Sequence, residues 1–74
     1  MKIGQLLRTI RTNKSMSLAQ VADAQISSSY LSKIERDQSD ITVTKLAHLL
    51  ERLSTTPEEF LFLVTAGRDH DYAT

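Results

Sequence analysis

The sequence contains no cysteine, one proline and two glycines in 74 residues. Without cysteine the chain can form neither disulfides nor thiolate metal sites, which fits a cytoplasmic protein. Pro57, Gly4 and Gly67 leave most of the chain free of helix breakers, so long helices are unobstructed. No apolar run has the length of a membrane span, and no secretory signal, repeat or low-complexity segment is visible. We therefore expect one small domain with no membrane segment.

Recognisable catalytic groups are also lacking. His48 and His70 are isolated, there is no glycine-rich phosphate loop, and no serine has a plausible histidine and aspartate around it. The adjacent residues Asp69, His70 and Asp71 are metal-ligand types, but neighbours in a polar tail rarely form a selective site. We expect no enzyme, no metal and no cofactor.

Charge is divided unevenly along a chain whose net charge is zero. Residues 1–36 carry six basic and two acidic residues, a net charge of +4, whereas residues 37–74 carry three basic and seven acidic residues, a net charge of −4. The basic half can face the phosphates of a nucleic acid while the acidic half faces away. Chance segregation is the alternative in so short a chain.

Residues 28–36 have the pattern of an amphipathic helix with a polar outer face. Leu31 and Ile34 are three residues apart, as a buried stripe requires, and Ser27 is a suitable N-cap. The outer face consists of small hydroxyl side chains and one cation: Ser28, Ser29, Ser32 and Lys33. Such a face can approach the major groove closely and bond to base edges, although an ordinary solvated helix has the same pattern.

A shorter capped helix precedes this segment. Ser17 and Gln20 have the spacing of a capping box, which predicts a helix that runs from residue 18 to residue 23 or 24. Residues 24–26 then form a turn, with Ile26 as its apolar plug. This order predicts a helix-turn-helix whose first helix crosses the DNA backbone while the second enters the groove. The helix that starts at residue 18 begins with free N–H groups and a positive dipole end, so its N-terminus, which Ser17 caps, is a candidate phosphate contact.

An amphipathic pattern also predicts a first helix over residues 2–13, with apolar positions Ile3, Leu6, Leu7 and Ile10. Arg8 and Arg11 lie on this helix and Lys14 follows it. For Arg8 and Lys14, contact with a phosphate backbone and simple solvation are both compatible with the pattern.

The second half of the chain predicts two more helices. Thr42 caps a helix over residues 43–53 whose broad apolar face makes it central to the core: Val43, Leu46, Ala47, Leu49, Leu50 and Leu53. His48 on this helix is interpreted as a surface residue. The segment 56–59 combines a capping box, a proline and first-turn acids, which predicts a helix over residues 57–65 that Gly67 ends.

Five consecutive apolar residues at 60–64 cannot all be buried by one small domain. Some of them are expected to face a second copy or another domain, the alternative being that one or two are simply exposed. The candidate dimer or partner surface comprises Phe60, Phe62, Leu63 and Val64. Residues 1–66 form the predicted domain, and residues 67–74 a polar tail or linker.

Two groups of residues carry a family resemblance over roughly residues 3–63. SLAQVA followed by ISSSYLSKIER resembles the Xre/Cro family of bacterial and phage repressors, whose fold is an all-α, five-helix bundle of the lambda-repressor-like type. The joined pattern SYLSKIERDQSDITVTKLAHLLERL and TPEEF resembles the DNA-binding domain of Rgg-type regulators. In those regulators a helical-repeat domain that senses peptide pheromones and dimerises follows.

The resemblance also implies roles for individual residues. Ser28, Ser29 and Lys33 match base-reading positions, and Arg36 matches a phosphate contact. Arg11 and Glu35 match an internal ion pair, which also makes sense because a buried carboxylate needs a partner. The remaining candidates are flanking residues: Ser32 and Tyr30 at bases or phosphates, and Lys45 at a phosphate. This sequence departs from the pattern at Asp37, where glycine is common, and at Leu18, where a polar phosphate contact is common. The resemblance then assigns that phosphate contact to Gln20 or to backbone N–H groups.

The sequence therefore predicts a double-stranded DNA-binding domain of a bacterial transcriptional regulator. With one strong base reader, Lys33, a monomer is expected to be weakly specific, and a homodimer on a palindromic site corrects this. The alternative is a protein-interaction module on the same fold, such as an antirepressor or antitoxin component, which the zero net charge favours.

Overall fold

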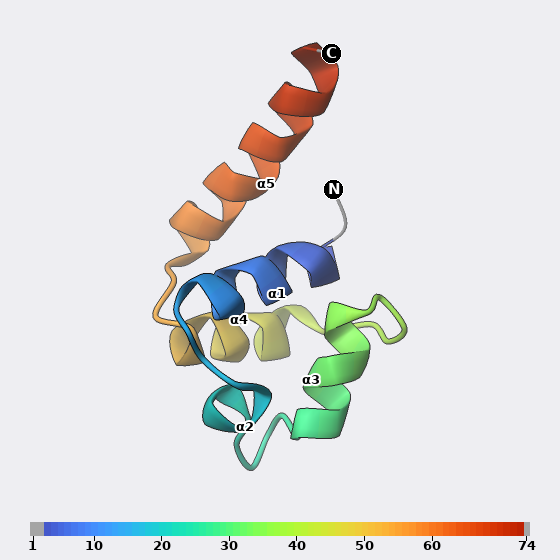
Figure 1. Ribbon diagram of the computed structural model, residues 1–74, viewed down its shortest axis with the longest axis vertical. Helices are drawn as coiled ribbons and strands as arrows, with labels where there is room; N and C mark the ends of the chain where they lie inside the picture. Colours follow the sequence, from blue (N-terminus) through green and yellow to red (C-terminus); the bar gives the residue numbers. More distant parts are fainter. Residues whose placement is uncertain (1–2, 74) are drawn as a thin grey trace.

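A computed structural model describes residues 3–73 as five α-helices (Figure 1). The helices are α1 (Ile3–Asn13), α2 (Leu18–Val21), α3 (Ser28–Glu35), α4 (Val43–Arg52) and α5 (Pro57–Ala73). The described part of the chain contains no strand, so the predicted all-α class is confirmed. None of its helices combines the length and the apolar character that a membrane span requires.

The core forms where the apolar faces of the helices meet. Helix α3 lies against both α1 and α2, while α5 extends from the end of α4 away from the other helices (Figure 1). Ile26, the predicted plug of the turn, is 1% exposed. The buried side chains are Leu6, Leu7, Ile10, Val21, Ile26, Leu31, Ile34, Leu49, Leu50, Leu53 and Phe60.

Three helices end in a left-handed residue that is not glycine. Ser15, Asp37 and Ser54 have φ angles of 56°, 56° and 54° and follow α1, α3 and α4. In each case the next N–H reaches back five residues to a helix carbonyl, as in Gln38 N to Lys33 O at 2.9 Å. These are Schellman ends, which satisfy the last carbonyls of a helix.

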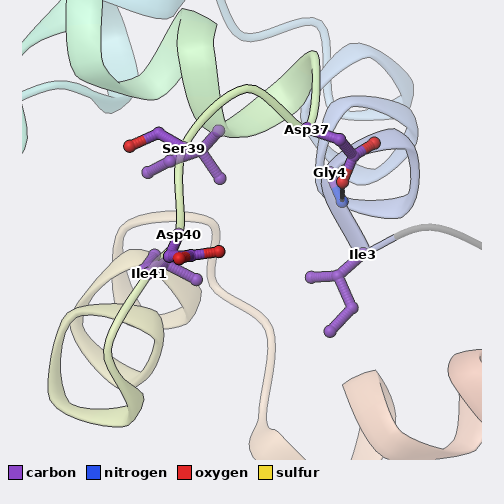
Figure 2. Close-up of a pocket in the computed structure, with 7 residues that line it drawn as sticks. Ile3, Gly4, Asp37, Ser39, Asp40 and Ile41 are labelled. Atoms are coloured by element: carbon purple, nitrogen blue, oxygen red, sulfur yellow. Dashed lines mark hydrogen bonds between the residues drawn. The ribbon is translucent and has the colours of Figure 1, made fainter.

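Asp37 has a second function that explains why it replaces glycine. Its Oδ1 accepts a hydrogen bond from Gly4 N at 3.2 Å, so it caps the start of α1 (Figure 2). A Cβ at position 4 would lie 2.2 Å from Ile34 O, so only glycine permits this approach of α1 to α3. The cap gained at α1 therefore compensates for the strained backbone at Asp37.

Helix α2 is shorter than predicted, because it ends at Val21 rather than at residue 23 or 24. Ala22 is extended, with φ −63° and ψ 152°. Asp23 Oδ1 then accepts from Gln25 N at 2.9 Å and from Ile26 N at 3.1 Å. This Asx-type turn competes with the helix for the same backbone groups, which is the reason for the early end.

Helix α5 is longer than predicted. It passes through Gly67 and continues to Ala73, so the prediction that Gly67 ends the helix is wrong. A glycine inside a helix costs roughly 1 kcal/mol but does not impose an end. The boundary between a domain at 1–66 and a tail at 67–74 stays a prediction. The side chains of Asp69, His70 and Asp71, and Lys2 at the start of the first helix, lie outside the described residues.

Candidate nucleic-acid interface

Helix α3 presents the predicted base-reading side chains on one open face. Ser27 Oγ accepts from Tyr30 N at 3.1 Å, which starts the helix where the sequence predicts. Leu31 and Ile34 are 1% and 2% exposed, so the opposite side of α3 is fixed in the core. The structure places four predicted residues together along an open cleft that Leu18 and Arg36 complete: Ser28, Ser29, Ser32 and Lys33.

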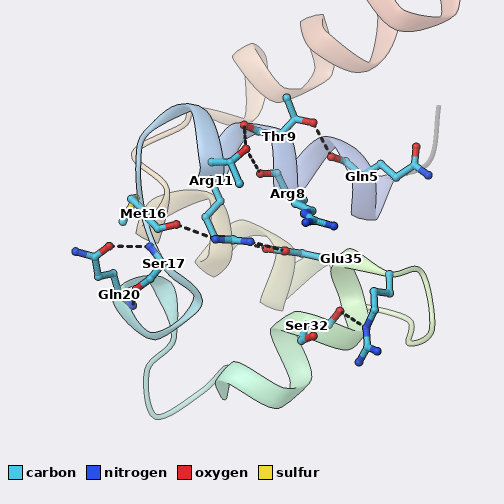
Figure 3. Close-up of polar contacts among 11 residues, drawn as sticks. Gln5, Arg8, Thr9, Arg11, Met16, Ser17, Gln20, Ser32 and Glu35 are labelled. Carbon is cyan, nitrogen blue, oxygen red and sulfur yellow. Dashed lines mark hydrogen bonds and ion pairs between the residues drawn. The ribbon is translucent and has the colours of Figure 1, made fainter.

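An ion pair fixes α3 to α1 from behind. Arg11 Nε and Nη2 donate to the two carboxylate oxygens of Glu35 at 2.7 and 3.0 Å, and Arg11 Nη1 donates to Met16 O at 2.8 Å (Figure 3). Glu35 is only 7% exposed. The hydrogen bond to Glu35 raises the pKa of Arg11, and the charge of Glu35 raises it further against the effect of burial. A buried, bidentate pair of this kind has one preferred geometry, so it sets the position of α3.

The start of α2 forms the predicted capping box. Gln20 N donates to Ser17 Oγ at 3.1 Å, and Ser17 N donates to Gln20 Oε1 at 2.7 Å (Figure 3). Both oxygens are thus used within the box, which leaves the Ser17 hydroxyl hydrogen and the Gln20 Nε2 hydrogens as donors. A phosphate oxygen can accept hydrogen bonds from those donors.

A second polar link, which the sequence did not predict, connects the turn to α4. His48 Nε2 and Asp23 Oδ2 are 2.5 Å apart, and because a carboxylate only accepts, Nε2 carries the proton. Arg52 Nε and Nη2 donate to Val21 O at 3.0 Å and Gln20 O at 2.9 Å, the last carbonyls of α2. The interpretation of His48 as an isolated surface residue is therefore wrong.

The same link changes the acidity of Asp23. The hydrogen bond from His48 lowers the pKa of the Asp23 carboxyl, and the N–H groups of Gln25 and Ile26 lower it further against the effect of desolvation. The i, i+4 spacing of His48 and Arg52 places both on one face of α4. That spacing was visible in the sequence, but nothing in it identifies the turn as their partner.

Lys14 has a structural role in place of the predicted phosphate contact. Its Nζ donates to Leu53 O at 2.6 Å, Ser54 O at 3.0 Å and Thr55 Oγ1 at 3.3 Å. An ammonium has three hydrogens, so these partners use all of them. Lys14 caps the carboxyl end of α4 and leaves the set of candidate phosphate contacts.

The other predicted cations lie around α3. Arg8 and Arg36 are exposed and line the same open hollow between α1 and α3. Arg36 Nε donates to Ser32 O at 3.3 Å. Lys45 Nζ lies 5.0 Å from the centre of the Tyr30 ring, a cation–π distance, and Tyr30 Oη donates to Asp40 O at 2.9 Å. Tyr30 therefore connects α3 to the next loop and positions Lys45 beside it.

The predicted partner surface on α5 needs correction. Phe60 is 4% exposed and belongs to the core, because it faces back toward α4. Leu63 and Val64 are half-buried against the same core, whereas Phe62 is 68% exposed. Leu61, which the prediction omitted, is 63% exposed.

Helices α4 and α5 leave an apolar groove between them. Val43 was predicted to face the core but is 84% exposed, and Ala47 is exposed as well. The groove is lined by Val43, Leu46, Ala47, Leu50, Pro57, Phe60 and Leu61. The apolar face of α4 is thus wider than the core of this domain can cover. The sequence of residues 43–53 does not show which of its apolar residues stay exposed.

Comparison with known proteins agrees with this geometry. The helix-turn-helix family matches residues 7–60, which is more than half of the chain. A serine-for-cysteine variant of the SHP pheromone receptor Rgg2 of Streptococcus dysgalactiae superposes with a TM-score of 0.78 at 30% sequence identity over 99% of this chain. A second Rgg2 structure from the same organism gives a TM-score of 0.76 at 33% identity over 96% of this chain.

These matches concern one part of the larger proteins. The chain spans 30% and 28% of the two Rgg2 chains. The family match at residues 7–60 includes the two capped helices and the turn between them. The chain therefore belongs to the helix-turn-helix family of DNA-binding domains and is similar to Rgg-type transcription regulators.

Proposed function

We propose that this domain binds double-stranded DNA sequence-specifically, with α3 in the major groove. The observation that carries the proposal is the open face of α3, where three serines and Lys33 lie together while the opposite face is locked in the core. Short hydroxyl side chains let the helix approach base edges. Lys33 is the strongest reader, because an ammonium can donate to the N7 and O6 acceptors of guanine.

Phosphate contacts hold the domain in register in this proposal. Arg8 and Arg36 line one hollow beside α3, and Lys45 lies near its other flank over Tyr30. The capping-box donors of Ser17 and Gln20 add contacts at the start of α2. The basic first half of the chain supports this arrangement.

A dimer on a palindromic site follows from the small number of strong readers. The apolar groove between α4 and α5, together with Phe62, is the surface that a second copy would cover. Half-sites about one helical turn apart fit such a dimer. In a longer cytoplasmic parent protein, a helical-repeat sensor domain is the further partner that the Rgg resemblance suggests.

Fluorescence anisotropy at several salt concentrations, with random duplex DNA and with a preferred duplex selected from a random library, tests the proposal. Binding should weaken steeply with salt, because Arg and Lys release counterions from phosphates. Arg36→Ala should weaken binding to all sequences alike and reduce the salt slope by about 1, whereas Lys33→Ala should relax specificity at one base pair. The two variants are matched, since each removes one exposed cation beside α3. Equal loss of specificity in both would contradict this division of roles.

The second candidate function is a protein-interaction module on the same fold. The exposed apolar groove and the zero net charge favour it. It predicts no DNA binding at low salt, even at protein concentrations where the chain dimerises. It also predicts that substitutions in the groove between α4 and α5, rather than on α3, abolish binding to the protein partner.

A further inference from the structure

The cleft on the DNA-facing side has one apolar wall. Among the described residues that line it, Leu18 alone has no polar or charged side chain; the others are Ser28, Ser29, Ser32, Lys33 and Arg36. Leu18 is the first residue of α2, is half-buried, and packs against the core. Its outer surface therefore has a fixed position beside α3, and its inner surface stabilises the fold.

The serines leave this apolar wall accessible. Each serine extends only one heavy atom beyond Cβ, so the three of them form a low floor in an open cleft of about 400 Å³. The long side chains of Lys33 and Arg36 line the same cleft and give it positive charge. An occupant must therefore offer a small apolar group beside acceptors or a negative charge.

A major groove offers one apolar group of this size, the C5-methyl of thymine, with the O4 acceptor next to it and phosphates at the groove edge. Serine hydroxyls donate and accept, so they discriminate poorly among bases on their own. A leucine side chain in contact with the methyl group favours thymine over the other bases, because the contact buries apolar surface on both partners. Hydroxyl groups do not supply this preference.

We propose that Leu18 and the serine floor of α3 form a thymine-methyl pocket, which makes Leu18 a specificity-determining residue. The proposal rests on the proposed binding of α3 in the major groove and names what one part of that surface reads. It also gives a reason for an apolar residue at the start of α2, where a phosphate-binding side chain would be expected. A sugar is the rival occupant of the apolar wall, and contact with a sugar carries no sequence information.

Deoxyuridine differs from thymidine only by the absent methyl group, so it isolates this contact. A preferred duplex is first selected from a random library with the 74-residue chain, and each thymine is then replaced by deoxyuridine. The wild type should bind one such duplex per half-site about fourfold more weakly, which corresponds to the loss of one buried methyl. Leu18→Ala should bind the thymine and deoxyuridine duplexes equally, and Leu18→Met, which is apolar and of similar volume, should retain the preference.

The readout is the ratio of the two dissociation constants, which does not change if a variant is partly unfolded. Ile3→Ala is the matched control, because it also shortens an apolar side chain to alanine, at an exposed position on α1 that does not line this cleft, and it should leave the ratio unchanged. If the wild type shows no thymine preference, if Leu18→Ala keeps it, or if the selected site has no thymine, the pocket is refuted while DNA binding stands. If no duplex is selected at all, the proposed function itself fails.

Discussion

Two polar links connect the helix-turn-helix to α1 and α4, on the side away from the open face of α3, and they differ in burial and chemistry. Arg11 and Glu35 join α1 to α3, with side chains only 12% and 6% exposed. His48 and Asp23 join α4 to the turn, with side chains 24% and 26% exposed, and Arg52 assists them. The first link is a buried bidentate pair, whereas the second is more exposed and contains a carboxyl, Asp23, whose pKa the hydrogen bond from His48 lowers. The contribution of the second link to the stability of the turn should therefore change with pH as Asp23 is protonated.

The largest effect is expected at the buried link. Glu35→Ala leaves the Arg11 guanidinium nearly buried without its carboxylate, which should lower the free energy of unfolding by about 3 kcal/mol. Urea unfolding followed by circular dichroism measures this. The double variant Arg11→Met, Glu35→Leu removes both charges and should lose much less than either single substitution. If Glu35→Ala leaves the free energy of unfolding unchanged, the ion pair does not stabilise the position of α3.

The link to α4 should have a smaller, pH-dependent effect, because solvent screens it. The pKa of Asp23 is lowered in the folded state, so its contribution is present above its unfolded pKa of about 3.9 and is lost as the pH falls through the lowered value. Asp23→Asn should therefore be less stable than the wild type at pH 7, and the two curves should converge below about pH 4.

Thermal unfolding from pH 7 to pH 2 measures that convergence. Asp40→Asn is the matched control, because it removes one carboxylate from an exposed position on the α3–α4 loop. Its stability difference from the wild type should not follow the same course. A constant difference between Asp23→Asn and the wild type at every pH would show that the hydrogen bond with His48 does not depend on the charge of Asp23.

The smallest changes in the free energy of unfolding are expected at the residues with positive φ that follow α3 and α4. Ser54→Gly after α4 should raise the free energy of unfolding by about 0.5 kcal/mol, because glycine adopts positive φ without strain. Asp37→Gly after α3 relieves the same strain but deletes the cap on Gly4, so it should be neutral or destabilising. Chemical denaturation of both variants compares them directly. Equal stabilisation by the two glycines would mean that the Asp37 cap contributes nothing.

Much of this molecule was predictable because its signals are local. The caps at Ser17, Ser27 and Thr42 and the apolar spacing around Leu31 act over three or four residues, so a single sequence contains them. The serines and Lys33 on the outer face of α3 follow from the same periodicity. The early end of α2 was missed, because the Asx-type turn at Asp23 and the helix use similar polar residues.

The sequence by itself thus determined where most helices start, which face of α3 is polar, and that the basic half contains it. Only the tertiary structure decided which polar side chains remain free for a ligand. Lys14 meets the end of α4 across 39 residues, His48 meets Asp23 across 25, and Val43 is exposed although its helix is apolar. These outcomes depend on which surfaces pack together, and hydrogen-bond donors consumed by distant partners leave no local trace in a sequence.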